Sequence, residues 1–331
     1  MSVTTYRSTD SGAPVLNGTS GNGLVNLLTI CLTGTGTAYG SLPKKGWTLL
    51  FTGTNKCVLR TVDGVGFLRV VHDGSVTGGF REALVRGAEG ATDVDTLVDP
   101  FPTVAEVADN SCVWRASDTL DTTARAWELT ADENWLILSV QFGTTAADTY
   151  VFGRYSPTRS ANSWPYVINT RNGANNSLDA SGASVMALAS VGGFNGARVY
   201  AMRTVDGVAK SPRAAFVTES APGTTSPGLP GQAGPQIPNT DGLIFMSPPQ
   251  LWVNGNAGLT LGNPQSAGFF PSLWSPLHNF STAAGRGAFY GDTFSAAGYD
   301  PSAQFVLRGP RGDANGKWII ETTDTWQDPL A

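Results

Sequence analysis

The chain has 331 residues, of which 40 are Gly and 20 are Pro, and only 14% carry a charge. Because 41% of the residues are hydrophobic and the net charge is only -5, the composition excludes a disordered protein, and the high Gly content excludes a coiled coil. Acidic residues outnumber basic ones by 26 to 21, and no apolar run approaches the roughly 20 residues that span a bilayer. We therefore expect no nucleic-acid partner and no membrane span, and a protein rich in strands and loops remains.

The N-terminal part begins with an extended arm over residues 1–16, followed by a helix predicted over 23–33. In the segment GLVNLLTICL, apolar residues recur at helical spacing. Asn22 lies where a helix cap is expected, and Gly34 follows the end of the pattern.

After the helix, short runs of β-branched and aromatic residues alternate with turn signals. Residues 47–52 and 56–61 flank a turn, and Asp63-Gly64 is a hairpin signal before a run over 67–72. Further strands are expected over 80–86, 124–129, 135–142, 150–155, 197–205 and 208–217. We predict a mainly β fold, made of antiparallel sandwich or meander modules with one short N-terminal helix and long loops.

Two segments of the first two-thirds are predicted to be loops from their composition. Residues 91–110 are acidic and contain Pro, whereas residues 156–184 are rich in Ser, Asn, Gly and Pro. A loop as long as the second one is usually functional, lies in an interface or is disordered.

The stretch 218–242 divides the chain, because it is rich in Pro and Gly and has no strand pattern. It predicts a β-rich N-terminal domain over 1–217, a linker or extended arm over 218–242, and a small β-rich C-terminal segment over 243–331. Within that last segment, strands are expected at 243–246, 250–253, 304–308 and 318–322.

Side chains with catalytic or metal-binding chemistry are few. The two histidines, His72 and His278, lack the spacing of a metal site and are expected to bond or pack within the chain. The three cysteines, Cys31, Cys57 and Cys112, are expected to be buried free thiols, with a disulfide or a reactive thiol as the alternative. No phosphate-binding loop and no nucleophile motif occurs in its proper context, so we assign no catalytic residue, no metal and no cofactor.

Acidic residues in predicted turns provide the remaining catalytic interpretation. Asp93, Asp95 and Asp99 share one loop, and Asp132 adjoins Glu133. A pair of carboxylates could support glycoside hydrolysis, and Asp93 with Asp95 could hold a cation weakly. Because Asp residues in turns usually accept hydrogen bonds from their own backbone, we favour that structural interpretation.

Aromatic residues in predicted loops are the candidate interaction sites. Large apolar side chains are seldom exposed in loops without a function, so they are interpreted as anchors in a protein interface, as platforms that stack on sugars, or as core residues. The residues assigned to an interface are Tyr6, Trp164, Tyr166, Phe269, Phe270 and Trp274.

Several short segments, taken in order, carry a resemblance to a known family. YRSTDSGAPVL at 6–16 precedes the helix, FTGTNK at 51–56 follows it, and RAW at 125–127 and DTW at 324–326 come later. This string of matches, firmest over residues 4–60, resembles a family of tailed-bacteriophage virion structural proteins. The resemblance implies a component of the particle but does not specify its position in the particle. It implies no catalytic residue.

The sequence thus predicts a non-enzymatic structural subunit of a tailed phage particle, used in several copies on the head surface, in the neck or collar, or in the tail. Expected partners are copies of the chain itself and other virion proteins, with residues 1–16 and 218–242 lying on neighbours. The expected location is the virion, after synthesis in the bacterial cytoplasm. One alternative is a tail-associated module that binds a host surface glycan through Trp164, Tyr166 or Trp274. The other is a polysaccharide-degrading enzyme that uses Asp93 or Asp95.

Overall fold

The computed structural model describes residues 2–19, 21–73, 76–77, 80–105, 112–143, 148–158, 164–170, 198–203, 214–218, 246–248, 250–254, 264–276, 293–294, 302–308 and 318–323. Within these ranges the fold is mainly β, its strands pair antiparallel, and the helix is α1 (Gly23–Leu32). The predicted fold class is therefore confirmed. No helix in the described ranges has the length and apolar character that a bilayer crossing requires.

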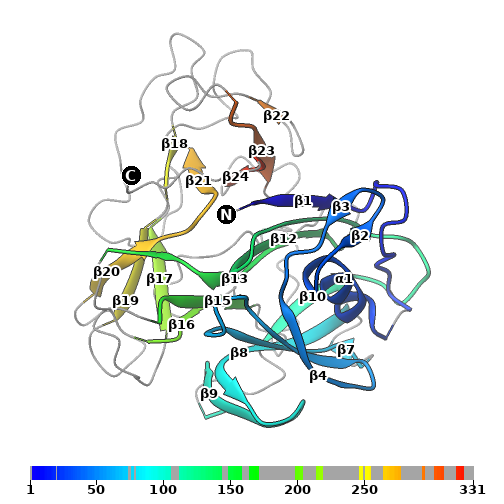
Figure 1. The fold of residues 1–331 in the computed structure, drawn as a ribbon, viewed down its shortest axis with the longest axis horizontal. Helices are drawn as coiled ribbons and strands as arrows, with labels where there is room; N and C mark the ends of the chain where they lie inside the picture. Colours follow the sequence, from blue (N-terminus) through cyan, green and yellow to red (C-terminus); the bar gives the residue numbers. More distant parts are fainter. Residues whose placement is uncertain are drawn as a thin grey trace.

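The largest sheet has ten strands and is called the central sheet here (Figure 1). In spatial order its strands are β1 (Thr4–Arg7), β11 (Ala126–Ala131), β12 (Trp135–Gln141), β13 (Asp148–Arg154), β15 (Tyr166–Thr170), β16 (Arg198–Ala201), β17 (Ala214–Thr218), β19 (Gln250–Asn254), β20 (Pro264–Phe269) and β14 (Ser156–Pro157).

Two further sheets and a small ribbon complete the described fold. The seven-stranded sheet has the order β10 (Val113–Ser117), β8 (Phe80–Ala91), β6 (Phe67–Val71), β5 (Lys56–Arg60) and β4 (Thr48–Gly53), with β7 (Val76–Thr77) and β9 (Leu97–Phe101) also paired with β8. The five-stranded sheet has the order β18 (Met246–Ser247), β21 (Leu273–Pro276), β24 (Trp318–Glu321), β23 (Phe305–Arg308) and β22 (Thr293–Phe294). The ribbon pairs β2 (Thr37–Tyr39) with β3 (Leu42–Pro43), and β2 contacts α1.

Both faces of the central sheet contribute to a core. In β12, Leu136 and Leu138 belong to a core shared with α1 and the seven-stranded sheet, whereas Trp135 and Ile137 belong to a second core shared with β21, β23 and β24. Successive residues of a strand point to opposite faces, so one strand can supply both cores. The three sheets therefore form three layers, with the central sheet in the middle (Figure 1).

Helix α1 forms close to where its sequence pattern predicts it. Its buried residues Leu24, Leu27, Leu28 and Cys31 recur at the spacing of one helical face. Asn22 occupies the N-cap position, but its side chain makes no capping hydrogen bond. The backbone N–H of Leu24 instead donates to Nδ1 of His72 at 3.0 Å, so a residue at the end of β6 caps the helix.

Three loop predictions are wrong. Residues 91–110 include β9, residues 156–184 include β14 and β15, and the aromatic segment 269–274 runs from the end of β20 into β21. β15 is bonded on both sides and buried throughout, so it lacks the alternation that marks a half-exposed strand. Among the described strands, β9 pairs with β8 alone, and such an edge strand tolerates its Pro100.

The predicted N-terminal arm lies on its own chain. β1 pairs with β11, with Thr4 opposite Ala131 and Arg7 opposite Glu128. Tyr6 is fully buried and Leu16 nearly so. β1 therefore belongs to the central sheet, and Tyr6 and Leu16 belong to the core of the same chain, which corrects the prediction that this arm lies on a neighbour.

The predicted division at 218–242 falls between two adjacent strands of the central sheet. β17 and β19 pair antiparallel, with Phe216 opposite Trp252. β19 and β20 therefore extend the sheet that the earlier strands begin. Residues 219–245 lie outside the described residues.

Candidate functional site

The polar contacts that join the layers begin in the tight turn between β5 and β6. Thr61 N–H donates to the Gly66 carbonyl, and Gly66 N–H donates to Oγ1 of Thr61, both at 3.0 Å. Oδ1 of Asp63 accepts from the N–H of Val65 at 3.0 Å, and Gly64 has a φ of +78°. A Thr, an Asp and a Gly at this spacing fold the turn by local side-chain bonds.

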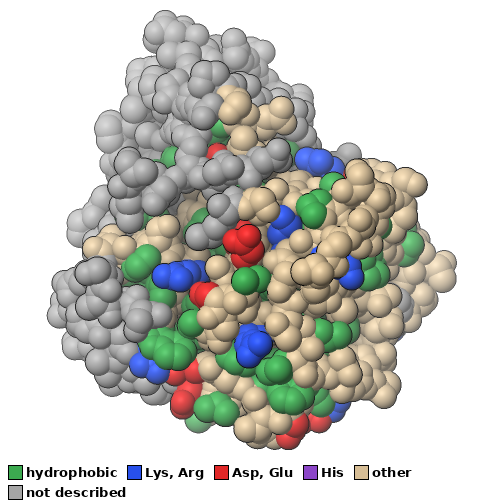
Figure 2. Space-filling view, viewed as in Figure 1, with side chains coloured by type: hydrophobic (Ala, Val, Ile, Leu, Met, Phe, Trp, Pro, Cys, Tyr) green, Lys and Arg blue, Asp and Glu red, His purple; other side chains and the backbone are tan. Residues whose placement is uncertain are grey.

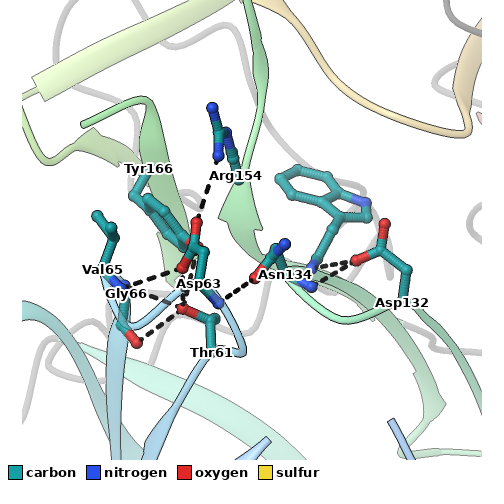
Figure 3. Close-up of polar contacts among 9 residues, drawn as sticks. Thr61, Asp63, Val65, Gly66, Asp132, Asn134, Arg154 and Tyr166 are labelled. Atoms are coloured by element: carbon teal, nitrogen blue, oxygen red, sulfur yellow. Dashed lines mark hydrogen bonds and ion pairs between the residues drawn. The ribbon is translucent and has the colours of Figure 1, made fainter. Parts of the chain in front are cut away.

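A second turn, between β11 and β12, lies against the first (Figure 3). Oδ1 of Asp132 accepts from the N–H groups of Asn134 and Trp135 at 2.6 and 2.7 Å. Oδ1 of Asn134 accepts from the Asp63 N–H at 3.0 Å, so the two turns are directly bonded. β13 passes close by, because Gly153 has a φ of +137° and a Cβ there would lie 2.2 Å from the Asn134 carbonyl oxygen.

Tyr166 and Arg154 complete this group, which we call the turn cluster: Thr61, Asp63, Asn134, Arg154 and Tyr166. The Tyr166 hydroxyl donates to Oδ1 of Asp63 at 2.7 Å and lies 2.9 Å from Oγ1 of Thr61 (Figure 3). Arg154 is half exposed and lies 3.5 Å from Oδ2 of Asp63, an ion pair of small energetic weight. The cluster thus ties the seven-stranded sheet to the central sheet.

The side chains of the turn cluster and of Asp132 form hydrogen bonds that hold the fold together. Burial raises the pKa of the Tyr166 phenol well above its ordinary value, so it stays a donor. Burial also raises the pKa of Asp132 to about 6, despite the two backbone N–H groups that favour its charged form. The sequence points to the Asp63-Gly64 turn but not to Tyr166, which is 103 residues away, so no spacing pattern could join them.

His72 performs the intrachain role that the sequence predicts for it. It is fully buried, and its Nδ1 accepts the Leu24 N–H, so the imidazole is neutral with its proton on Nε2. Burial, helped by the nearby Arg81 guanidinium, lowers its pKa to about 4. His278 lies outside the described residues.

The acidic loop is also held by local bonds. Oδ1 of Asp93 accepts from the N–H groups of Asp95 and Thr96 at 2.7 and 2.9 Å, which lowers the pKa of Asp93. Asp95 pairs with Lys56 and, at 3.0 Å, with Arg69, and the hydrogen bond from Lys56 lowers its pKa most. These contacts agree with the turn interpretation rather than with a pair of catalytic carboxylates.

No metal-binding arrangement occurs in the part of the chain that the structure describes. There, no group of three or more His, Cys, Asp or Glu residues lies together as a metal would need. Cys31, Cys57 and Cys112 are free and buried, as the sequence predicts.

Four of the six residues assigned to an interface lie in the interior of the chain. Tyr6 is fully buried, and its hydroxyl donates to the Cys31 carbonyl at 3.0 Å. Tyr166 is fully buried in the turn cluster. Phe270 packs against Trp135 with ring centroids 5.5 Å apart, and Trp274 meets Phe305 edge-on. Each therefore packs as a core residue, the third interpretation that the sequence left open.

The other two assigned residues, Trp164 and Phe269, are partly buried. The Arg203 guanidinium lies 4.7 Å from the centroid of the Trp164 ring, and its Nε bonds Oε1 of Glu89 at 3.0 Å. One face of the Trp164 ring is thus covered by a side chain of the same protein. An interface role for the six residues stays a prediction.

Comparison with protein-family models and with curated proteins gives no match to this chain. What the protein does must therefore be inferred from its own residues. Among the residues that the structure describes, the exposed large apolar side chains are Val15, Leu49, Val62, Val98, Val104 and Leu120. On the face shown in Figure 2, hydrophobic side chains are scattered among polar atoms rather than gathered in one large patch.

Proposed function

We propose that the chain is a non-enzymatic structural subunit of a tailed bacteriophage particle, and that it acts by assembling in several copies. The observation that supports assembly is the open edge of the seven-stranded sheet. β4 pairs with β5 on one side, and no described strand pairs with it on the other (Figure 1). Its sequence, TLLFTG, has neither a charge nor a Pro to block pairing, but the strand carries a β-bulge at Leu50, and Trp47, directly before it, is bonded to Leu32 and Gly34.

The polar side chains with catalytic potential support the same proposal. His72 caps a helix, Asp93 and Asp132 fold turns, and Asp95 forms ion pairs. Each of these groups is used to hold the fold. The resemblance to virion structural proteins is the reason for proposing that the chain is located in the phage particle, after synthesis in the host cytoplasm.

The glycan-binding alternative receives no support from the described residues. Stacking on a sugar needs an aromatic face that is open to solvent. Tyr166 and Trp274 are buried, and Arg203 covers one face of Trp164. We therefore develop the assembly proposal alone.

Quantitative mass spectrometry of purified, DNA-filled particles from a phage that encodes this chain tests the proposal. We expect the chain in several copies per particle, and an antibody against it should decorate intact particles in electron micrographs. A control phage with a stop codon at an early position should lack both signals. Detection of the chain only in the soluble fraction of the lysate, and never in particles, would overturn the proposal.

A further inference from the structure

We propose that the hydrogen bond between His72 and Leu24 is an acid-sensitive latch. While His72 is neutral, the bond holds the first turn of α1 against the end of β6, and protonation of the imidazole releases that turn before the rest of the chain unfolds. The inference goes beyond the proposed function and does not depend on it, because it concerns how a single chain responds to acid.

The latch can form in only one protonation state of His72. Nδ1 of His72 accepts the Leu24 N–H at 3.0 Å. A backbone N–H can only donate, and both ring nitrogens of a protonated imidazole are donors as well. Protonation therefore leaves two donors facing each other, so the bond must break.

The surroundings of His72 also oppose a positive charge. Its side chain is fully buried, and its Nε2 has no hydrogen-bond partner among the described residues. The N-terminus of α1 carries the positive end of the helix dipole. Burial, and then the Arg81 guanidinium, lower the pKa of His72 to about 4. Asp73 acts in the opposite direction but is exposed, α1 has no charged residue, and Lys56 of β5 pairs with Asp95.

The start of α1 has weak local support apart from His72. Asn22 at the N-cap makes no side-chain hydrogen bond, and the first turn has no acidic residue to favour the helix dipole. Gly21 and Gly23 flank Asn22, and glycine regains more conformational freedom on release than any other residue. A segment of this kind can open without global unfolding.

Contacts on both sides of this turn limit the opening. The Gly18 carbonyl accepts from Nε of Arg81 at 2.8 Å, and the Gly18 N–H donates to the Asp121 carbonyl at 3.0 Å. Neither bond needs a group that changes its charge near pH 5. Further along the helix, Leu27 and Leu28 are fully buried in the core shared with the seven-stranded sheet. The released part is therefore the first turn of α1, between these two anchors.

Hydrogen–deuterium exchange of the full chain at pH 7 and pH 5 tests the latch. The reporters are the amides of Leu24 and Asn26, whose acceptors are His72 and the Asn22 carbonyl. After correction for the intrinsic effect of pH on exchange, their protection should fall by roughly 20-fold at pH 5, because the pKa of His72 is 6.5 when the latch is open and about 4 when it is closed. The amides of β12 should keep their protection, since a local opening leaves the central sheet intact.

His72→Asn isolates the latch, because Asn keeps an acceptor for the Leu24 N–H but cannot take up the proton. In this variant the Leu24 and Asn26 amides should be equally protected at both pH values. The matched control is Asp132→Asn, which removes a different buried group whose pKa is about 6. It should leave the loss of protection at α1 unchanged.

Three results would overturn the latch. In the first, α1 and β12 lose protection equally at pH 5, which means that acid opens the whole chain. In the second, the protection of α1 in the wild-type chain does not change with pH. In the third, His72→Asn loses as much protection as wild type. The first two need only the wild-type chain, so the inference can be refuted even if the variant does not fold.

Discussion

The change His72→Asn tests how strongly the buried imidazole couples folding to pH. Nδ1 of His72 accepts the Leu24 N–H at the start of α1, and the side chain is fully buried. Oδ1 of Asn stands the same number of bonds from the backbone as Nδ1 of His. The variant therefore keeps an acceptor at the helix terminus and removes the group that titrates.

The size of the effect follows from the pKa of His72, which burial lowers from 6.5 to about 4. Because the folded pKa is the lower one, the unfolded chain binds the proton first as the pH falls. Stability that is present above pH 6.5 is therefore lost as the pH falls through about 4. At about 1.4 kcal/mol for each pKa unit, the loss amounts to about 3 kcal/mol.

Asp132 acts in the opposite direction over nearly the same pH range. Burial raises its pKa from 3.8 to about 6, so the folded chain binds this proton first as the pH falls. Its contribution to stability is fully present below pH 3.8 and is lost as the pH rises through about 6, again by about 3 kcal/mol. In the wild-type chain the two contributions should largely cancel between about pH 4 and 6.

Urea unfolding followed by tryptophan fluorescence, repeated from about pH 4 to 7, measures both effects. Relative to wild type, His72→Asn should gain about 3 kcal/mol in free energy of unfolding as the pH falls across this range, and Asp132→Asn should lose about as much. Comparison with wild type removes the contributions of the other carboxylates. If both variants differ from wild type by a constant amount at every pH, the reasoning is refuted. The slope of the free energy of unfolding against urea concentration should be the same in wild type and both variants, so that their stabilities can be compared directly.

Three further outcomes are expected. Tyr166→Phe should lower the free energy of unfolding by about 1–3 kcal/mol, because Oδ1 of Asp63 loses a buried donor, and an unchanged urea midpoint would contradict this. Gly153→Ala should cost at least about 3 kcal/mol, because its Cβ would lie 2.2 Å from the Asn134 carbonyl oxygen. The control Gly34→Ala, also at positive φ but with no atom within 4 Å, should cost only about 1 kcal/mol in the same assay. Burial raises the thiol pKa values of Cys31 and Cys57 to about 12, so the native chain should resist iodoacetamide at pH 8, with labelling only after unfolding; rapid native labelling would contradict this.

Sequence reasoning located the strands that have one exposed face or a clear turn beside them. The turn after β4 has Asn55 at a φ of 57°, and β5 and β6 flank Asp63-Gly64, so local chemistry marks both hairpins. The pairing of β23 with β24 was likewise predictable from two apolar runs around a Gly-rich turn. These features depend on neighbouring residues alone.

The missed elements depend on distant partners instead. β15 lies between β13 and β16 in the middle layer, and its residues YVINT show no alternation because both faces are buried. The loop assignment followed the polar composition around it. The same cause affects the aromatic residues. Phe270 and Trp274 follow Gly- and Pro-rich stretches and look exposed in sequence, but Phe270 belongs to the second core of the central sheet and Trp274 is buried against Phe305.

The turn cluster was the least predictable part of the candidate site. Its Asp63-Gly64 turn is visible in the sequence, but Tyr166 reaches it only because β15 of the central sheet lies against β8 of the seven-stranded sheet. Gly66 permits that approach, since a Cβ there would lie 2.2 Å from the Tyr166 ring. Such contacts follow from tertiary packing, which residue spacing does not encode.

The pairing of β1 with β11 sets the timing of folding on the ribosome. Thr5 bonds Thr130, a residue 125 positions later in the chain. At the usual synthesis rate of roughly 5–20 residues per second, the first strand made must wait on the order of ten seconds for its partner to emerge. The N-terminal strand therefore docks only after the strands of the seven-stranded sheet, which end at Ser117, have been made, and nascent chains that end before β11 leave the Tyr6 side chain without its final burial site.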